Sequence, residues 1–255
     1  MAKIVACYKW VIDETDIRVK DDLSIDVSRA QRKLSDYDRN TIEAAVRAAK
    51  EAGAQAVGLT FGTDKIKPSL KEALSRGLTE VYWVASDKAE SADGKITANI
   101  LAAAIRTIKD VSVVLCTDGS SDSFARQTAP RIAAILGWPV VTGVRQLEIA
   151  GDAATVTQAR ENSWETLRAP LPAVFAVLPE INPAPIPGLM AIVSAAKKPN
   201  TELKAEDLGA SFETNVRTAG AKGYAMDRKN IMFTEGAMAD RVRELALALR
   251  KEGVL

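Results

Sequence analysis

The chain has 255 residues, with 34 lysines and arginines against 33 aspartates and glutamates, two cysteines and no histidine. A net charge of +1 excludes a charge-driven binder of nucleic acid or anionic membranes. The missing histidine excludes Ser-His-Asp and Cys-His catalysis and histidine-ligated zinc sites. No apolar run approaches the roughly 18 residues that span a bilayer, and residues 1–7 enter a strand-like run without a secretory leader pattern. We therefore expect a cytoplasmic protein with no membrane span, no nucleic-acid partner and no metal.

The two cysteines, Cys7 and Cys116, lie far apart in the sequence, each within an apolar run. This placement predicts reduced core thiols rather than a disulfide or a metal site. With the histidine-dependent sites excluded, chemistry would rest on carboxylates, lysine, arginine, hydroxyls or a bound cofactor. A bound cofactor is the simplest interpretation, so we expect no catalytic residue in this chain.

In the first half of the chain, short apolar runs alternate with amphipathic segments. The pattern predicts strands over residues 4–8, 56–61, 81–84 and 111–116, and helices over residues 40–52, 68–76, 97–109 and 122–136. Strands separated by helices of this length indicate an α/β fold with a doubly wound, mostly parallel sheet. The loops after the strands would then gather at one edge of the sheet, where nucleotides usually bind.

The second half of the chain changes character. Short alternating runs over 144–149, 154–160 and 164–168 predict an added antiparallel hairpin, followed by a buried strand over 173–177. Four prolines at positions 179–187 predict a stiff, exposed loop.

A polar tail without clear periodicity, residues 200–234, precedes a predicted amphipathic helix over 238–251. We expect a nucleotide-binding domain over 1–199 and a C-terminal arm over 200–255. Because the terminal helix needs a surface on which to bury Val242, Leu245 and Leu249, wrapping around a partner is favoured over a mobile tail.

The loop after the 111–116 strand is rich in small hydroxylated residues and runs into the next predicted helix. It comprises Gly119, Ser120, Ser121, Asp122 and Ser123, with Arg126 one turn into the helix. Free N–H groups at a helix start, together with hydroxyls, can cradle a phosphate. The alternative is an ordinary helix start capped by Asp122 or Ser123, with Arg126 solvated.

Two further junctions are candidate ligand contacts. Asp38 fits the N-cap of the 40–52 helix, and Tyr37 beside it could either cover an aromatic ligand at the sheet edge or simply pack. Phe61 and Gly62 form a strand–turn junction where a backbone can approach a ligand closely. The sequence contains neither GxGxxG nor GxxxxGK[ST], so the usual dinucleotide and P-loop fingerprints do not apply.

The proline-rich loop carries aliphatic side chains: Ile181, Ile186, Leu189 and Met190. On a rigid exposed loop such residues suit docking to another protein. The alternative is that they tuck into the domain.

Taken together, several segments resemble the β subunit of the electron transfer flavoproteins. They are Ala6 to Asp13, Trp164 to Leu167 with Pro170 to Val174, Asn182 to Met190, Ala195 to Pro199, and Arg217 to Gly220. Within that family, Tyr37-Asp38 and the Asp118 to Asp122 loop resemble the Fix-type subgroup, which is associated with acyl-CoA and carnitine-type metabolism. Thr117-Asp118-Gly119 departs from the family's usual Gly-Lys-Gln and makes this loop less positive. The segment from about residue 221 to 236 is longer than the family norm.

The resemblance implies an adenine-nucleotide α-hydrolase-like fold and an α/β heterodimer. FAD would sit mainly on the α subunit, and this chain would hold AMP or, in electron-bifurcating members, a second FAD. By position, the nucleotide site would use Cys7, Ser35, Asp36, Tyr37, Asp38, Phe61, Gly62 and the 119–123 loop, continuing through Arg126, Gln127 and Thr128. Ile186, with Leu189 and Met190, would dock an acyl-CoA-type dehydrogenase.

Three hypotheses follow. The first is an electron-carrier subunit, the second an electron-bifurcating flavoprotein with a redox-active FAD in this chain, and the third a stand-alone nucleotide-binding module. FAD and AMP content separates the first two hypotheses. A soluble, monomeric chain without a partner would indicate the third.

Overall fold

The computed structural model describes residues 1–214, 216, 218–225 and 228–255. Contacts divide the chain into two compact units. The first comprises residues 1–18 and 26–220, and the second comprises residues 19–25 and 221–255.

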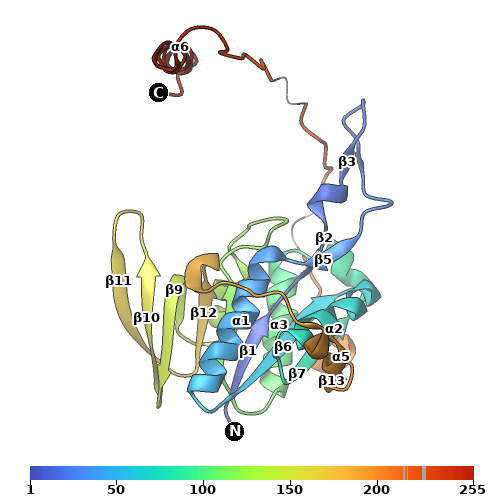
Figure 1. Ribbon diagram of the computed structural model, residues 1–255. Coiled ribbons are helices and arrows are strands. Elements are labelled where there is room, and N and C mark those ends of the chain that lie inside the picture. The colour runs from blue at the N-terminus through green and yellow to red at the C-terminus, as the bar shows by residue number, and fades with distance from the viewer. Residues whose placement is uncertain (215, 217, 226–227) are drawn as a thin grey trace. The chain divides into compact units, whose positions relative to one another are not determined.

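A nine-stranded sheet forms the centre of the first unit (Figure 1). Its order is β11-β10-β9-β12-β8-β1-β6-β7-β13. The parallel strands are β1 (Lys3–Cys7), β6 (Gln55–Gly62), β7 (Glu80–Ala85), β8 (Val111–Thr117), β12 (Ala173–Val177) and β13 (Asn200–Glu202). The antiparallel extension consists of β9 (Val140–Ala150), β10 (Ala153–Ala159) and β11 (Trp164–Pro170), and β9 pairs parallel with β12 where it joins the main sheet. The predicted α/β fold with an added antiparallel hairpin is confirmed.

Helices cover both faces of the parallel strands. Alternate residues of β1 face opposite ways: Ile4 and Ala6 join the core under α1 (Asp36–Glu51) and α2 (Lys67–Ser75). Val5 and Cys7 join the core under α3 (Gly94–Thr107) and α4 (Thr128–Leu136). This two-sided burial explains why the central strands are nearly continuous apolar runs. The shorter α5 (Leu189–Ala195) packs against α2.

Four helices begin at residues other than those predicted: α2 begins at Lys67 and α3 at Gly94, and the two larger differences bear on the site. The 40–52 helix begins at Asp36, so Asp38 lies inside its first turn and is not the N-cap; that position belongs to Ser35. The 122–136 helix begins only at Thr128, because Phe124 and Arg126 adopt left-handed backbone angles, with φ of +45° and +55°. Asp122 and Ser123 are therefore not helix caps.

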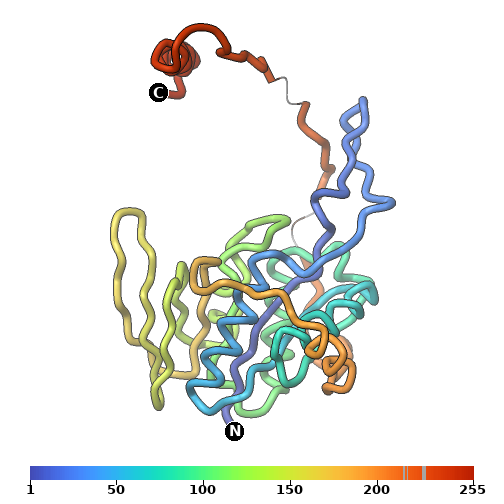
Figure 2. Tube along the Cα trace, viewed as in Figure 1, coloured from blue at the N-terminus to red at the C-terminus, as the bar shows by residue number. Residues whose placement is uncertain are grey.

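The first part of the predicted tail belongs to the first unit. Residues 200–202 form β13, which adds in parallel to β7, and residues 205–208 form a 3-10 helix (Figure 2). Farther along, the Phe212 ring lies 6.4 Å from the Phe61 ring. The compact unit consequently extends to Gly220, beyond the boundary expected at residue 199.

Two short pairs of strands lie outside the nine-stranded sheet. They are β2 (Trp10–Ile12) with β5 (Arg32–Leu34), and β3 (Arg18–Val19) with β4 (Ile25–Asp26). In the second unit, the helix predicted over 238–251 is confirmed as α6 (Met238–Lys251). Val242 and Leu245 on it are exposed by 58% and 44%. Of the helices in the described part of the chain, none has the length and apolar character to cross a bilayer.

Phe175 tests the packing of the central sheet, since it is fully buried on β12. We expect Phe175→Ala to lower the free energy of unfolding by about 3–5 kcal/mol, because truncation leaves a cavity between the sheet and α1. Phe175→Leu keeps more of the volume and should cost distinctly less. Urea denaturation followed by circular dichroism measures both, and equal losses for the two variants would contradict this packing.

Candidate functional site

The strand order places the topological switch point of the sheet between β1 and β8, and we use the word crevice for the region just beyond the carboxyl ends of these two strands. The chain leaves β1 through α1 to reach β6 on one side, whereas β8 pairs with the opposite side of β1. Connections that diverge from neighbouring strands leave an opening beyond their carboxyl ends, where open α/β sheets bind ligands. The carboxyl ends here are Cys7 and Thr117, followed by the loops that the sequence singled out.

Buried polar contacts hold the segment 35–38 against the end of β1. The Lys9 backbone N–H donates to Asp38 Oδ2 at 2.8 Å, and the Ser35 N–H donates to the Lys9 carbonyl at 3.0 Å. The Ser35 hydroxyl in turn accepts a hydrogen bond from the Ser121 N–H at 3.1 Å. Ser35 and Ser121 thus join α1 to the loop after β8, as their predicted common site requires.

Asp122 fills the hydroxyl-rich loop with its own carboxylate. Oδ1 accepts from the Ser120 hydroxyl at 2.6 Å and the Ser123 N–H at 2.8 Å, and Oδ2 accepts from Lys9 Nζ at 2.6 Å. Burial raises the pKa of Asp122, but the hydrogen bonds from Lys9 and Ser120 outweigh it and hold the pKa below its usual value. Donors expected to face a phosphate are therefore already engaged by an internal anion.

Phe124 and Arg126 cover the same loop. A Cβ placed on Gly119 would come within 2.5 Å of the Phe124 ring, so only glycine permits this close packing. The Phe124 ring also meets the Tyr37 ring edge-on at 6.0 Å between centroids. The Arg126 guanidinium lies over the Phe124 ring, with Cζ 4.8 Å from the ring centroid, and its Nε lies 3.0 Å from Asp118 Oδ2. Arg126 thus pairs with a carboxylate instead of standing free at a helix start.

The side chains of Cys7 and Cys116 are buried free thiols on neighbouring strands. Their hydrogen bond and their burial raise the pKa of Cys116 well above its usual value, so this thiol stays neutral. The prediction of core thiols is confirmed. Because the Cys7 side chain belongs to the core under α3, only its backbone is available to the crevice.

The remaining predicted contacts lie around the ends of β6 and α4. Phe61 packs against Phe212, and Gly62 accommodates Ile66, whose Cγ2 would lie 2.2 Å from an added Cβ. Gln127 occupies the N-cap position of α4, with its Oε1 beside Gly94, and Thr128 begins the helix. Asp36 pairs with Arg39 at 2.9 Å.

The sequence interpretation did not assign Lys9 or Phe124 to the site, and it named Asp118 as a departure that makes the loop less positive. Lys9, Asp118 and Phe124 make the central contacts of the crevice, yet each looks locally like an ordinary loop residue. The only sequence signal was charge: Asp118 and Asp122 in one loop require nearby cations, and the structure supplies Arg126 and Lys9.

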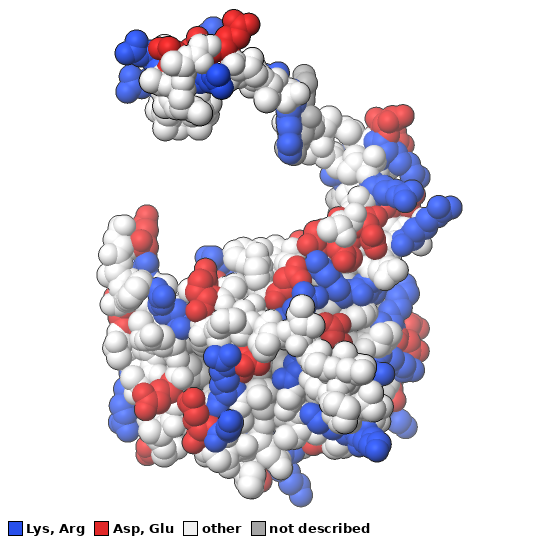
Figure 3. Space-filling view, viewed as in Figure 1, with Lys and Arg blue, Asp and Glu red and all other residues white. Residues whose placement is uncertain are grey.

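The proposed docking residues are exposed, as expected for that role: Ile186 by 92%, Leu189 by 76% and Met190 by 80%. Ile181, by contrast, packs against the core under α1. Figure 3 shows an uncharged surface over α5 with basic side chains beside it.

Polar contacts anchor both ends of this loop. Asn40 Nδ2 donates to the Asn182 carbonyl at 2.6 Å, and Asn182 Nδ2 donates to the Asn40 carbonyl at 3.1 Å. The Lys198 ammonium donates to the carbonyls of Leu74 and Leu78 at 3.0 and 2.7 Å. Arg76 adds a contact of 3.3 Å to the Pro185 carbonyl. The aliphatic side chains are therefore displayed on a fixed backbone.

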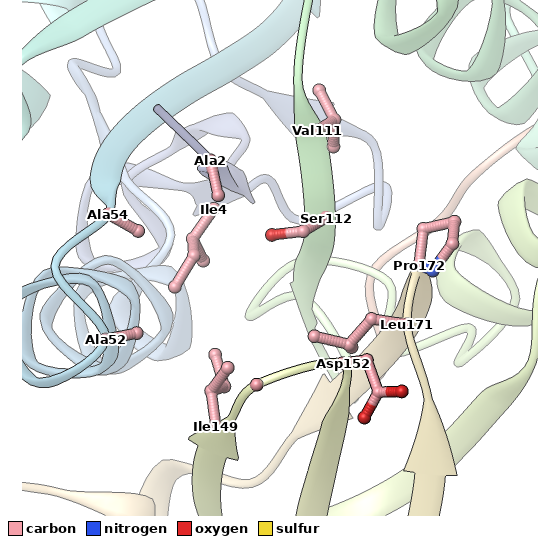
Figure 4. Close-up of a pocket in the computed structure, with 11 residues that line it drawn as sticks. Ala2, Ile4, Ala52, Ala54, Val111, Ser112, Ile149, Asp152, Leu171 and Pro172 are labelled. Atoms are coloured by element: carbon pink, nitrogen blue, oxygen red, sulfur yellow. The ribbon is translucent and has the colours of Figure 1, made fainter.

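A cavity of about 410 Å³ lies at the opposite, amino end of the sheet (Figure 4). Ala2, Ile4, Ser112, Leu171 and Pro172 are among its lining residues. It includes none of the predicted nucleotide-site residues. Within the described residues, no group of three or more cysteine, aspartate or glutamate side chains is arranged to hold a metal ion.

In a comparison with known families, a model described as the electron transfer flavoprotein domain matches residues 22–208. The matched range contains the segment 35–38, the loop after β8, the antiparallel extension and the proline-rich loop. It confirms the resemblance at the level of the family. The Arg-Thr-Ala-Gly motif lies beyond this range, and its Arg217 is outside the described residues.

Asp38 gives the site a pH dependence. Burial raises its pKa from 3.8 to about 7, against the opposing hydrogen bond from Lys9. The folded state therefore holds a proton that the unfolded chain releases, so stability falls as pH rises from about 4 to 7 and levels off above. Asp38→Asn keeps an acceptor for Lys9 and should remove this loss, gaining at most about 1.4 kcal/mol per pH unit over the wild type.

Urea denaturation of both proteins between pH 5 and pH 8 measures the difference. The stabilisation by Asp38→Asn should grow up to neutral pH and then stay constant. Parallel pH profiles for the two proteins would show that Asp38 titrates normally.

Proposed function

The chain belongs to the electron transfer flavoprotein family, and on that premise we propose that it is the β subunit of a cytosolic α/β heterodimer. The heterodimer carries electrons from an acyl-CoA-type dehydrogenase to a downstream acceptor. FAD, held mainly by the α subunit, supplies the redox chemistry. The resemblance of Tyr37-Asp38 and the Asp118 to Asp122 loop supports the Fix-type subgroup.

The side chains that come together beyond the carboxyl ends of β1 and β8 are the observation that carries this proposal. This region lies where open α/β sheets bind nucleotides, and it holds the hydroxyls of Ser35 and Ser121 together with the exposed Arg126. The chain has no histidine. Such a site suits binding and orienting a cofactor better than acid–base catalysis.

AMP is the ligand that we propose for this crevice, with a second FAD as the alternative. Ser35, Ser121 and the backbone at Cys7 would border the nucleotide, Tyr37 would offer an aromatic face, and Arg126 would offer a cation. Both ligands share the adenosine and phosphate groups that these residues suit. The alternative would make the heterodimer electron-bifurcating.

The C-terminal arm and α6 are proposed to wrap the α subunit. Val242 and Leu245 are exposed on α6 even though their helical spacing forms an apolar stripe. Burying that stripe against another chain would gain stability from the hydrophobic effect. An apolar stripe that needs a second chain to bury it also disfavours the hypothesis of a stand-alone nucleotide-binding module.

The cofactor content of the co-purified heterodimer tests the proposal most directly. We expect one FAD and one AMP per dimer after extraction and chromatography. Two FAD per dimer would contradict the electron-carrier hypothesis and support the electron-bifurcating alternative. A heterodimer lacking flavin would contradict the proposed function.

The proline-rich loop gives a second test. Ile186 is proposed to enter an apolar pocket of the dehydrogenase, so Ile186→Ala should slow electron transfer between the proteins about tenfold. Flavin content and unfolding should stay at wild-type values, because the side chain is exposed. Val140→Ala, another exposed aliphatic residue, is the matched control. Equal rates for Ile186→Ala and Val140→Ala would contradict docking through this loop.

A further inference from the structure

Asp118 is a fixed point at the edge of the crevice. Its backbone N–H donates to the Val177 carbonyl at 2.9 Å, and its Oδ1 accepts from the Gly143 N–H at 3.1 Å. Only 9% of its side chain is exposed. The carboxylate is therefore tied to β12 and β9 and does not move freely with the loop that follows it.

Arg126 is the movable partner of this carboxylate. Its side chain is 60% exposed, and its Nε lies 3.0 Å from Asp118 Oδ2. The same guanidinium lies over the Phe124 ring, which in turn packs on Gly119 and meets Tyr37. The Asp118–Arg126 ion pair thus helps to hold the aromatic ring against the loop and Tyr37.

The backbone shows that this arrangement needs side-chain support. Phe124 and Arg126 have φ angles of +45° and +55°, a region that residues with a Cβ rarely adopt. Such backbone persists where surrounding contacts hold it in place. Loss of the ion pair would let this segment return to ordinary backbone angles and move the ring away.

A phosphate can compete for Arg126. Guanidinium groups bind phosphate oxygens strongly and in bidentate geometry, whereas Asp118 receives its close contact from Nε. We propose that the Asp118–Arg126 pair keeps Phe124 closed over the crevice, and that a nucleotide opens it by drawing Arg126 onto its phosphate. This inference rests on the proposed nucleotide site and adds selectivity for nucleotides over nucleosides. A nucleoside has no phosphate to draw Arg126 away from Asp118, so Phe124 stays closed.

Calorimetric binding of AMP and adenosine to the full chain, freed of bound nucleotide, tests this closure. Arg126→Gln removes both the ion pair and the phosphate contact. It should therefore tighten adenosine binding about fivefold, the upper range for an exposed ion pair. It should also weaken AMP binding about tenfold, because a charge-assisted contact is lost. Opposite signs for the two ligands distinguish closure from a simple phosphate contact.

Asp118→Asn supplies the matched variant, since asparagine can still accept from the Gly143 N–H. It frees Arg126 and should tighten both ligands about fivefold. In an Arg126→Gln background the same change should have no further effect, because its action passes through Arg126. Thermal unfolding of each variant checks that the fold is retained.

Several results would overturn closure. Adenosine binding unchanged by Arg126→Gln would leave Arg126 as a phosphate contact only, and Asp118→Asn acting equally in both backgrounds would mean that it does not work through Arg126. Should Asp118→Asn fail to fold, the opposite signs expected for Arg126→Gln still decide. If AMP binds the wild type but no variant behaves as expected, closure alone fails. If AMP binds neither the wild type nor any variant, the nucleotide site fails as well.

Discussion

The parallel pairing of β1 with both β6 and β8 is the constraint on which the rest of the structure depends. Because β1 is a central parallel strand and helices cover both faces of the sheet, its residues are buried on both faces, with Ile4 facing α1 and Val5 facing α3. The connections leaving this strand pair diverge, and the crevice at their carboxyl ends is a consequence of that topology. The same strand pairing fixes where the loops that border the crevice begin.

Charge neutralisation then shapes the crevice. Its two loop aspartates are each matched by a cation, Asp122 by Lys9 and Asp118 by Arg126. Asp38 is buried farther inside and forms no ion pair with the described residues; burial raises its pKa more than the N–H and the charge of Lys9 lower it. The charges of Asp118 and Asp122 are therefore balanced by ion pairs, whereas the buried Asp38 avoids an unpaired charge by holding a proton more tightly. The two cations available to a bound anion at this site are Lys9 and Arg126, and the side chain of Arg126 is the more exposed.

The proline-rich loop follows a different principle. Its ends are fixed by polar contacts, from Asn182 to α1 and from Lys198 to the C-terminal end of α2, while Ile186 between them is almost fully exposed. Prolines reduce the number of backbone states that the loop would otherwise lose on binding. A fixed backbone that carries exposed aliphatic side chains suits docking to another protein.

The sequence by itself determined eight of the nine strands of the sheet, the α/β class and the helix 238–251, because hydrophobic periodicity is local and these segments repeat it over several residues. It also indicated the loops 35–38 and 119–123 as site candidates. Tertiary structure alone decided that α4 begins at Thr128, since the Phe124 and Arg126 backbone is held by Tyr37 and Asp118. It likewise decided that residues 200–202 add a strand to β7. Contacts between residues far apart in the chain leave no period in the sequence, so only the folded chain could reveal them.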